Sequence, residues 1–417
     1  MSKVKLTSML FCFFSLSFFS QNATLLDSLF KADSLFNNPI ISNPKKFKTQ
    51  ILFTQINRNE NNKPSFVNHA YQINENYFYP ASTVKLPMSI LSLQKLNELN
   101  KIPRSSILIA DSAFYCQEKT KMDTSAKAIK PSIENYIKQM LLVSDNSAFT
   151  RLYEFVGFDY LHQSLAKAGY EKVRLNSRLN ANCSGDTAKI TPPVYLLNDN
   201  GDTLYKQALA FPTHTLPHPL ASAKVGVAYF DVGRKKINKP KDFKQHNYFS
   251  ITDMHTILKD LIFSSDSVKQ NHFKLEVEQR QFLIQQMGLY PRESQMPQYP
   301  NEIYFDSFKK YFMYGNAVAK VKEDSVRVIN VVGRAYGFLI DCAYIIDLKN
   351  KVEFLLTAVV FVNERNVIGS GKYEYEKLGL PFLKDLSLVL YKYEAKRKRK
   401  YKPDLQEFQQ LFNYKYK

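Results

Sequence analysis

The chain has 417 residues, of which 45% are hydrophobic, 14% are aromatic and 23% are charged, and its formal net charge is +19. This apolar share is typical of a folded protein and excludes an intrinsically disordered chain. Thirteen glycines and eighteen prolines are too few for a collagen-like or low-complexity architecture, and the length indicates one large domain or two modest ones.

The N-terminus is typical of a secretory signal peptide. Lys3 and Lys5 precede an apolar run over residues 10–19, which is followed by a small residue. A basic start, a short apolar run and a small residue mark such a segment, whereas a membrane span needs about 20 apolar residues. We expect residues 1–20 to be removed and the mature protein to be exported, to the periplasm or out of the cell. An uncleaved anchor is the alternative, because the large Phe18 lies near the cleavage point.

The first elements of the mature chain are a helix, a hairpin and a second helix. Spaced apolar residues predict a helix over 22–36. Residues 50–57 are typical of a strand, and 66–73 are predicted to return beside it, because the segment between them is rich in turn-forming residues. After Pro80 the apolar residues recur at helical spacing, and helices are expected to dominate as far as about residue 170.

Ser82 and Lys85 form a Ser-x-x-Lys pattern where the expected strand gives way to the helix. The pattern occurs at least seven times in this chain, so only its position singles out this copy. Three residues apart on a helix, the two side chains share a face. Burial and the positive end of the helix dipole both lower the pKa of a lysine, which can then accept the serine proton. The same dipole favours the oxyanion that forms when Ser82 attacks a carbonyl.

Ser144-Asp145-Asn146 follows 62 residues after Ser82 and is the only Ser-Asp-Asn in the chain. Ser144 is expected to relay a proton between Lys85 and a leaving group, and Asn146 is expected to donate its amide to a substrate carbonyl. The alternative is a helix cap, a role that both Ser and Asp fill readily.

Residues 189–248 interrupt this plan, since they contain six prolines and are expected to form an irregular excursion. His214 and His218 are four apart, as zinc ligands on a helix are, but neighbouring prolines exclude the helix and no metal site is expected. His255 is expected on the surface of an amphipathic helix. The Tyr and Phe residues of 295–315 are expected to pack within the protein rather than to bind carbohydrate.

Three cysteines follow the signal segment: Cys116, Cys183 and Cys342. An odd number allows at most one disulfide and excludes a disulfide framework. No Cys-x-x-Cys occurs, so neither a structural zinc site nor a redox pair is indicated. Buried free thiols are the expectation.

The C-terminal end returns to strands. Short strands are predicted over 326–332, 338–346 and 352–362, and a long helix begins at about residue 373. Together with the N-terminal hairpin, they indicate an α/β (α+β) fold. Its antiparallel sheet is built from both ends of the chain and flanked by helices, with a mostly helical domain inserted between the strands.

Much of the positive charge, +17 without Lys3 and Lys5, lies in the last helix and in a basic C-terminal tail over 393–417. The residues of this run are Lys392, Lys396, Arg397, Lys398, Arg399, Lys400 and Lys402. Such a run indicates nucleic-acid binding in a cytoplasmic protein, but export argues against that partner. The solvated end of a helix is the favoured interpretation, and a weak association with anionic surface phosphates is the alternative.

Ser-x-x-Lys followed by Ser-Asp-Asn at this separation resembles the penicillin-recognising serine hydrolases. The resemblance is specifically to the class A β-lactamase-like family, which shares its fold with penicillin-binding transpeptidases. The resemblance runs from about residue 22 to residue 392 without 189–248, and it implies one serine hydrolase domain over 21–392. The implied substrate is a β-lactam, a peptidoglycan-derived peptide or another amide or ester acyl donor. No cofactor is implied, and the sequence gives no oligomeric state.

The resemblance also implies a role for each motif residue. Ser82 is the acylated nucleophile, Lys85 is its general base and Ser144 relays the proton. Asn146 binds the substrate. The family's oxyanion hole corresponds to the backbone N–H groups of Ser82 and Arg334.

The third motif of the family departs from its pattern here. Where Lys-Thr-Gly is expected on a late strand, the chain has Val331-Val332-Gly333. In the family that lysine holds the substrate carboxylate and supports the proton relay, so the substrate site is expected to have lost a cation. Arg334 restores the charge one residue beyond Gly333 if its side chain faces the site.

The loop that supplies a water-activating glutamate in class A β-lactamases has no Glu here over Asn176–Cys183. We therefore expect weak deacylation, and an enzyme that resembles a penicillin-binding protein or an esterase more than an efficient β-lactamase. The alternative is a binding protein that has kept the fold and lost the chemistry.

Overall fold

The computed structural model describes residues 24–100, 102–120, 129–179, 183–263, 273–318, 321 and 325–413. The expected signal segment therefore lies outside the described residues. Among those described, no helix is both long and apolar enough to span a membrane.

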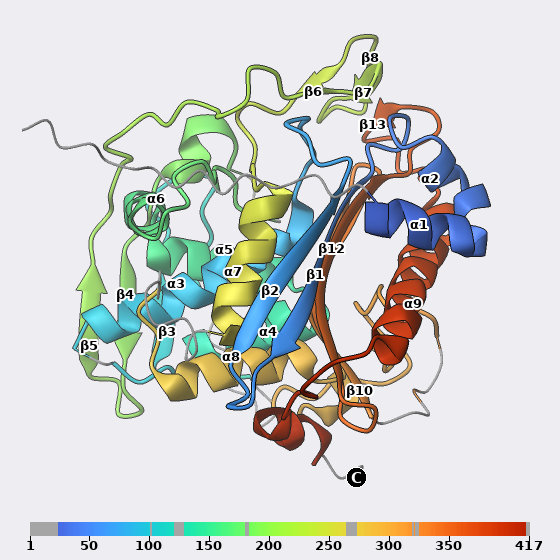
Figure 1. Ribbon diagram of the computed structural model, residues 1–417. Helices are drawn as coiled ribbons and strands as arrows, with labels where there is room; N and C mark the ends of the chain where they lie inside the picture. Colours follow the sequence, from blue (N-terminus) through green and yellow to red (C-terminus); the bar gives the residue numbers. More distant parts are fainter. Residues whose placement is uncertain are drawn as a thin grey trace, which may run out of the picture.

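A five-stranded antiparallel sheet in the order β10-β11-β12-β1-β2 forms the centre of the structure (Figure 1). The strands are β1 (Gln50–Arg58), β2 (Pro64–Tyr71), β10 (Val326–Ala335), β11 (Phe338–Asp347) and β12 (Val352–Phe361). Strand β1 pairs with β12 in the register Gln50↔Val359, so the two ends of the chain meet in the middle of the sheet. The predicted fold class is confirmed.

Helices cover both faces of this sheet. Because successive side chains of a strand point to opposite faces, Ile51 and Phe53 belong to one hydrophobic cluster and Leu52 to the other. In Figure 1, α1 (Thr24–Ala32) and α9 (Leu380–Lys396) lie on one side of the sheet, while α7 (Ile251–Phe263) lies on the other. The remaining helices beside the sheet are α2 (Pro39–Ser42) and α8 (Val277–Gly288).

The middle of the chain forms a mostly helical region beside the sheet. Its helices are α3 (Lys85–Glu98), α4 (Ile133–Val143), α5 (Asn146–Val156) and α6 (Phe158–Lys167). A small sheet of β3 (Ile107–Ala110), β4 (Val194–Leu197) and β5 (Thr203–Gln207) completes it. The prediction of an irregular excursion over 189–248 is therefore wrong for residues 194–197 and 203–207, because β4 pairs with β3 and β5 pairs with β4.

The other elements are short. The two-residue or three-residue strands are β6 (Lys224–Val225), β7 (Ala228–Phe230), β8 (Lys236–Ile237), β9 (Lys241–Asp242) and β13 (Val367–Ile368). The 3-10 helices are η1 (Ser34–Asn37), η2 (Ala81–Val84), η3 (Gly185–Lys189), η4 (Pro291–Glu293) and η6 (Gln406–Phe412), and η5 (Tyr375–Gly379) is a π-helix.

His255 is buried, so the prediction of a surface histidine is wrong. Its Nε2 lies 2.7 Å from Thr54 Oγ1 on β1, and its Nδ1 lies 2.8 Å from Thr357 Oγ1 on β12. The histidine lies on the face of α7 that packs against the sheet, and two strand threonines satisfy both ring nitrogens. Amphipathicity alone does not reveal such partners, because they are distant in the sequence.

The basic C-terminal tail is only partly solvated. Its described lysines (Lys396, Lys398, Lys400 and Lys402) are exposed, but Arg397 and Arg399 both form ion pairs with the fully buried Glu394. Beyond them Phe408 and Leu411 of η6 are buried in the core. The interpretation as the solvated end of a helix is therefore wrong for the arginines, since Glu394 lies in the last turns of α9 and binds them.

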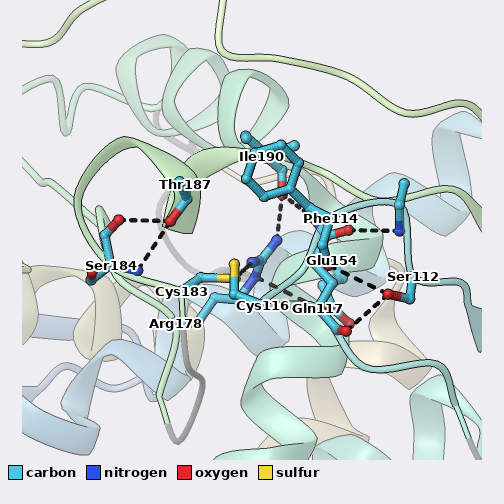
Figure 2. Close-up of a disulfide and its surroundings, with 11 residues drawn as sticks. Ser112, Phe114, Cys116, Gln117, Glu154, Arg178, Cys183, Ser184, Thr187 and Ile190 are labelled. Carbon is cyan, nitrogen blue, oxygen red and sulfur yellow. Dashed lines mark hydrogen bonds and ion pairs between the residues drawn. A yellow bond between two sulfur atoms is a disulfide. The ribbon is translucent and has the colours of Figure 1, made fainter.

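Cys116 and Cys183 form a disulfide, while Cys342 is free and buried. The expectation of free thiols is thus wrong for two of the three, which lie 67 residues apart in the sequence. Figure 2 shows Arg178 beside the disulfide, where it donates to the Ile190 carbonyl and lies near the buried carboxylate of Glu154. The disulfide and the ion pair fasten the segment after α6 to the helical region.

Candidate active site

Ser82 lies in η2, the single helical turn that leads into α3. Ala81, the residue before it, has a φ of +49°, a left-handed conformation that a side chain with a Cβ rarely adopts. Such strain is retained where the surrounding structure holds it, and it is concentrated at functional sites. The half-buried Ser82 side chain lines a cleft between the helical region and β10.

Lys85, the first residue of α3, connects the two sequence motifs. Its Nζ lies 3.0 Å from Ser82 Oγ and 3.0 Å from Ser144 Oγ. It also donates to the Ser144 carbonyl at 2.6 Å and to Asn146 Oδ1 at 2.8 Å. The structure thus places the four predicted residues Ser82, Lys85, Ser144 and Asn146 around one ammonium group.

The Ser-Asp-Asn motif forms the junction of α4 and α5. Ser144 ends α4 with a φ of +60°, and Asp145 caps α5 by accepting a hydrogen bond from the Ala148 amide at 2.7 Å. The helix-cap interpretation is therefore correct for Asp145. Asn146 begins α5 and turns its carbonyl oxygen to Lys85, which leaves its NH₂ group available to a ligand.

The environment of Lys85 lowers the pKa of its side chain to about 7. Burial is the largest cause, the positive charge of Lys309 is the second, and Asp145 opposes both. Since burial disfavours a charged amine, about half of the Lys85 side chains are neutral at pH 7. A neutral amine 3.0 Å from a serine hydroxyl can act as its general base.

Gly333 brings β10 into direct contact with the turn that holds Ser82. A Cβ on Gly333 would lie 2.6 Å from the Pro80 carbonyl oxygen and 3.3 Å from the Ala81 Cβ. A larger residue at this position would separate the strand from the nucleophile. The absence of a side chain at Gly333 therefore allows this close approach.

Arg334 was expected to replace the missing cation if its side chain faced the site, but the side chain has other partners. Its guanidinium forms a 2.6 Å ion pair with Glu376 and lies 4.4 Å from the centre of the Tyr375 ring. Arg334 is not among the described residues that line the cleft.

About 250 Å³ of space lies between the atoms of the cleft, and part of it is open solvent. It is lined by Ser82, Lys85, Met140, Leu141, Ser144, Lys309, Asn330, Val331 and Val332. Lys309 and Asn330 are the polar residues that the sequence analysis missed. No motif marks Lys309, which lies in the 295–315 segment expected only to pack, and two residues of that segment, Tyr311 and Phe312, are indeed buried.

No carboxylate lines the cleft among the described residues. Within the same described residues, no group of three His, Cys, Asp or Glu side chains is arranged to hold a metal ion. Part of the loop without glutamate, residues 180–182, lies outside what the structure describes.

Residues 38–393 match the model of a family described as the beta-lactamase enzyme family. No curated protein matches the chain. Among solved structures, a β-lactamase from Sphaerobacter thermophilus DSM 20745 is 11% identical with a TM-score of 0.46, covering 89% of this chain and 98% of that one. A β-lactamase from Xanthomonas campestris pv. campestris is 12% identical with a TM-score of 0.45, covering 88% and 95%. A structure of PBP-A is 12% identical with a TM-score of 0.46, covering 90% and 98%.

Proposed function

The chain belongs to the beta-lactamase enzyme family, and on this basis we propose that it is a serine hydrolase that forms an acyl-enzyme on Ser82. Its substrates are β-lactams or related amides and esters, including peptidoglycan-derived peptides. The observation that carries the proposal is the position of Lys85, whose Nζ is 3.0 Å from both the Ser82 and the Ser144 hydroxyl oxygens.

Acylation follows from this geometry. Neutral Lys85 accepts the Ser82 proton while Ser82 Oγ forms a bond to the substrate carbonyl carbon. The backbone N–H groups of Ser82 and Arg334 stabilise the oxyanion, and the Asn146 NH₂ group binds a second carbonyl of the substrate. Lys85 then returns the proton through the Ser144 hydroxyl to the leaving group, and the bond between that group and the carbonyl carbon breaks.

Deacylation is slow in this proposal. Hydrolysis of the ester between Ser82 and the acyl group needs a base that activates water. The sequence of Asn176–Cys183 contains no Glu, and the described lining of the cleft contains no carboxylate. Both observations favour an enzyme that remains acylated for a long time over an efficient β-lactamase.

We also propose that the protein is exported. The basic and apolar N-terminal segment over residues 1–20 supports this, and so does the Cys116–Cys183 disulfide, since such bonds persist in oxidising compartments. The exposed lysines of the C-terminal tail support a weak association with anionic surfaces there.

Intact mass spectrometry with benzylpenicillin tests the proposed function. The mature protein should gain the mass of one penicillin and keep it for many minutes, and Ser82→Ala should gain none. Ser42→Ala is the matched control, because Ser42 is exposed and begins another Ser-x-x-Lys, with Lys45. That variant should be acylated like the wild type.

Two other results would change the assignment. Loss of the drug without a lasting adduct would show efficient turnover and contradict slow deacylation. The absence of any adduct with β-lactams, esters and peptides would favour the alternative, a binding protein on the same fold, and Ser82→Ala would then bind ligand as tightly as the wild type.

A further inference from the structure

Lys309 enters the cleft from a segment outside every motif, residues 305–316, and its backbone is held in a strained conformation. Its φ is +62°, which is uncommon for a residue with a long side chain. The Lys309 N–H donates to Asn316 Oδ1 at 2.8 Å, and its carbonyl accepts from Asn330 Nδ2 at 3.0 Å. Two asparagine side chains therefore hold the backbone from which the Lys309 side chain reaches the cleft.

A buried polar network fixes this arrangement to the sheet. The same Asn330 NH₂ group donates to Asp341 Oδ1 at 2.8 Å. The other oxygen of Asp341 accepts from the backbone N–H groups of Tyr311 and Phe312, at 3.1 and 2.9 Å. Because Asp341 lies on β11 and Asn330 on β10, the segment that follows Lys309 is bound to two strands of the central sheet.

Lys310, the next residue, has a different role from Lys309. Its buried Nζ donates to the Met287 carbonyl at 2.5 Å, to the Val328 carbonyl at 2.8 Å and to Asn330 Oδ1 at 2.9 Å. All three of its hydrogens are thus used inside the protein. Lys310 anchors the segment in the core, whereas Lys309 lines the cleft.

The Lys309 ammonium has no hydrogen bond and no ion pair among the described residues. It lies over the Phe308 ring, with its Nζ 5.0 Å from the ring centre. Burial and the positive charge of Arg334 lower the pKa of Lys309 to about 8, so most of these side chains are charged at pH 7. Arg334 itself forms an ion pair with Glu376. A largely buried cation without a counter-ion is costly, and a bound anion would remove that cost.

We propose that Lys309 binds a carboxylate of the acyl donor, and that it supplies from segment 305–316 the cation that is missing at Val331. This inference rests on the proposed function and narrows the substrate to anionic acyl donors. Val331, Val332 and Lys309 line the same cleft as Ser82. A donor whose carbonyl group lies at Ser82 therefore occupies the cleft that Lys309 also lines.

The test compares benzylpenicillin with its methyl ester, which differs only in lacking the negative charge. Acylation rates of the wild type, Lys309→Met, Lys309→Arg and the control Lys398→Met are measured by intact mass at low donor concentration. Lys309→Met should acylate about ten- to a hundredfold more slowly with benzylpenicillin, the range of one charge-assisted hydrogen bond, and less than threefold more slowly with the ester. Lys309→Arg should recover part of the loss. Lys398 is exposed in the C-terminal tail. Lys398→Met therefore removes the same charge at a position outside the cleft, and it should change neither acylation rate.

Equal losses with both donors would overturn the inference, because Lys309 would then act on the chemistry or the fold and not on the carboxylate. If neither donor acylates the wild type, the proposed function fails. The inference is then tested by calorimetry, which measures the binding affinity of both donors for Ser82→Ala and for Ser82→Ala/Lys309→Met. Tighter binding of the anion that depends on Lys309 would support the inference. No preference for the anion, or no binding at millimolar concentration, would overturn it.

Discussion

Lys85 donates to both oxygens of Ser144, at 2.6 Å to the carbonyl and 3.0 Å to the hydroxyl. The left-handed backbone of Ser144, with a φ of +60°, turns both groups of this residue toward the same ammonium. A proton can therefore pass between Lys85 and Ser144 without any movement of the backbone.

Ser144→Ala separates the two roles of this residue. The hydroxyl that relays the proton is lost, while the carbonyl still accepts from Lys85, so we expect acylation to slow by about a hundredfold with little change in melting temperature. The measurement is the rate of the benzylpenicillin adduct by intact mass, beside the melting temperature from circular dichroism. A rate within threefold of the wild type would show that Lys85 delivers the proton directly.

The pH dependence of acylation should report the protonation states of the two lysines in the cleft, Lys85 and Lys309. Lys85 must be neutral to accept a proton, and its pKa is about 7, so the rate should rise as the pH increases through 7. Lys309 must be charged to bind an anionic donor, and its pKa is about 8, so the rate should fall above pH 8. The acylation rate at low benzylpenicillin concentration should therefore peak between these values. A rate that stays constant between pH 6 and pH 9 would contradict both assignments.

The variant Lys309→Met should change the shape of this profile as well as its height. Without the positive charge of Lys309, the pKa of Lys85 rises, because that charge is one of the causes that lower it. The acidic limb should therefore move to higher pH and the alkaline limb should disappear. Normalised profiles measured with the methyl ester, which does not need the cation, isolate the effect on Lys85.

The parts of the site that the sequence predicted are those that depend on local spacing. Ser82 and Lys85 lie three residues apart and share a helical face, and Ser144 belongs to a motif found once. Lys309 could not be predicted, because its position depends on the side chains of Asn316 and Asn330 and on a strained backbone that no sequence pattern marks. A contact between residues far apart in the chain leaves no periodic signal.

The same contrast holds for the fold. The strands and terminal helices were predicted from periodicity, and the central sheet is confirmed. The partners of His255 were not predicted, since this side chain finds them on two strands that only the tertiary structure brings close. The Cys116–Cys183 pairing was missed for the same reason.

Gly333→Ala should damage the site through the backbone. The new methyl group would lie 2.6 Å from the Pro80 carbonyl, so β10 and the Ser82 turn must separate. We expect acylation to fall by more than a hundredfold and the unfolding free energy to fall by about 1–3 kcal/mol, the usual cost of overpacking. Urea unfolding and adduct formation measure the two effects. Ala335→Gly, two residues along the same strand, controls for a general disturbance of β10 and should retain most of the acylation rate.

His255 should make the protein less stable in mild acid. Burial, with the positive charge of Lys259, lowers its pKa to about 3. The histidine therefore remains neutral in the fold, while it gains a proton below pH 6.5 in the unfolded chain. Stability is then lost as the pH falls from 6.5 toward 3, by about 2 kcal/mol between pH 7 and pH 5.

The variant His255→Gln tests this contribution, because the other buried histidines are unchanged in it and their effects cancel in the comparison. Urea unfolding at pH 7 and pH 5 should show a smaller loss of stability in the variant than in the wild type. Equal losses in both proteins would show that His255 does not remain neutral in the folded state.

Strand β1 obtains one of its neighbours, β2, within a few residues, but the other, β12, lies about three hundred positions further along the chain. Pairings of such long sequence separation form slowly, because a large loop must be closed before they contribute. During synthesis, β12 must leave the ribosome before the second edge of β1 can be paired. A nascent chain interrupted before residue 352 therefore holds a hairpin with an open edge, which other chains can join. The central sheet therefore forms late in synthesis, and the N-terminal strands remain incompletely paired until the C-terminal strands have been made.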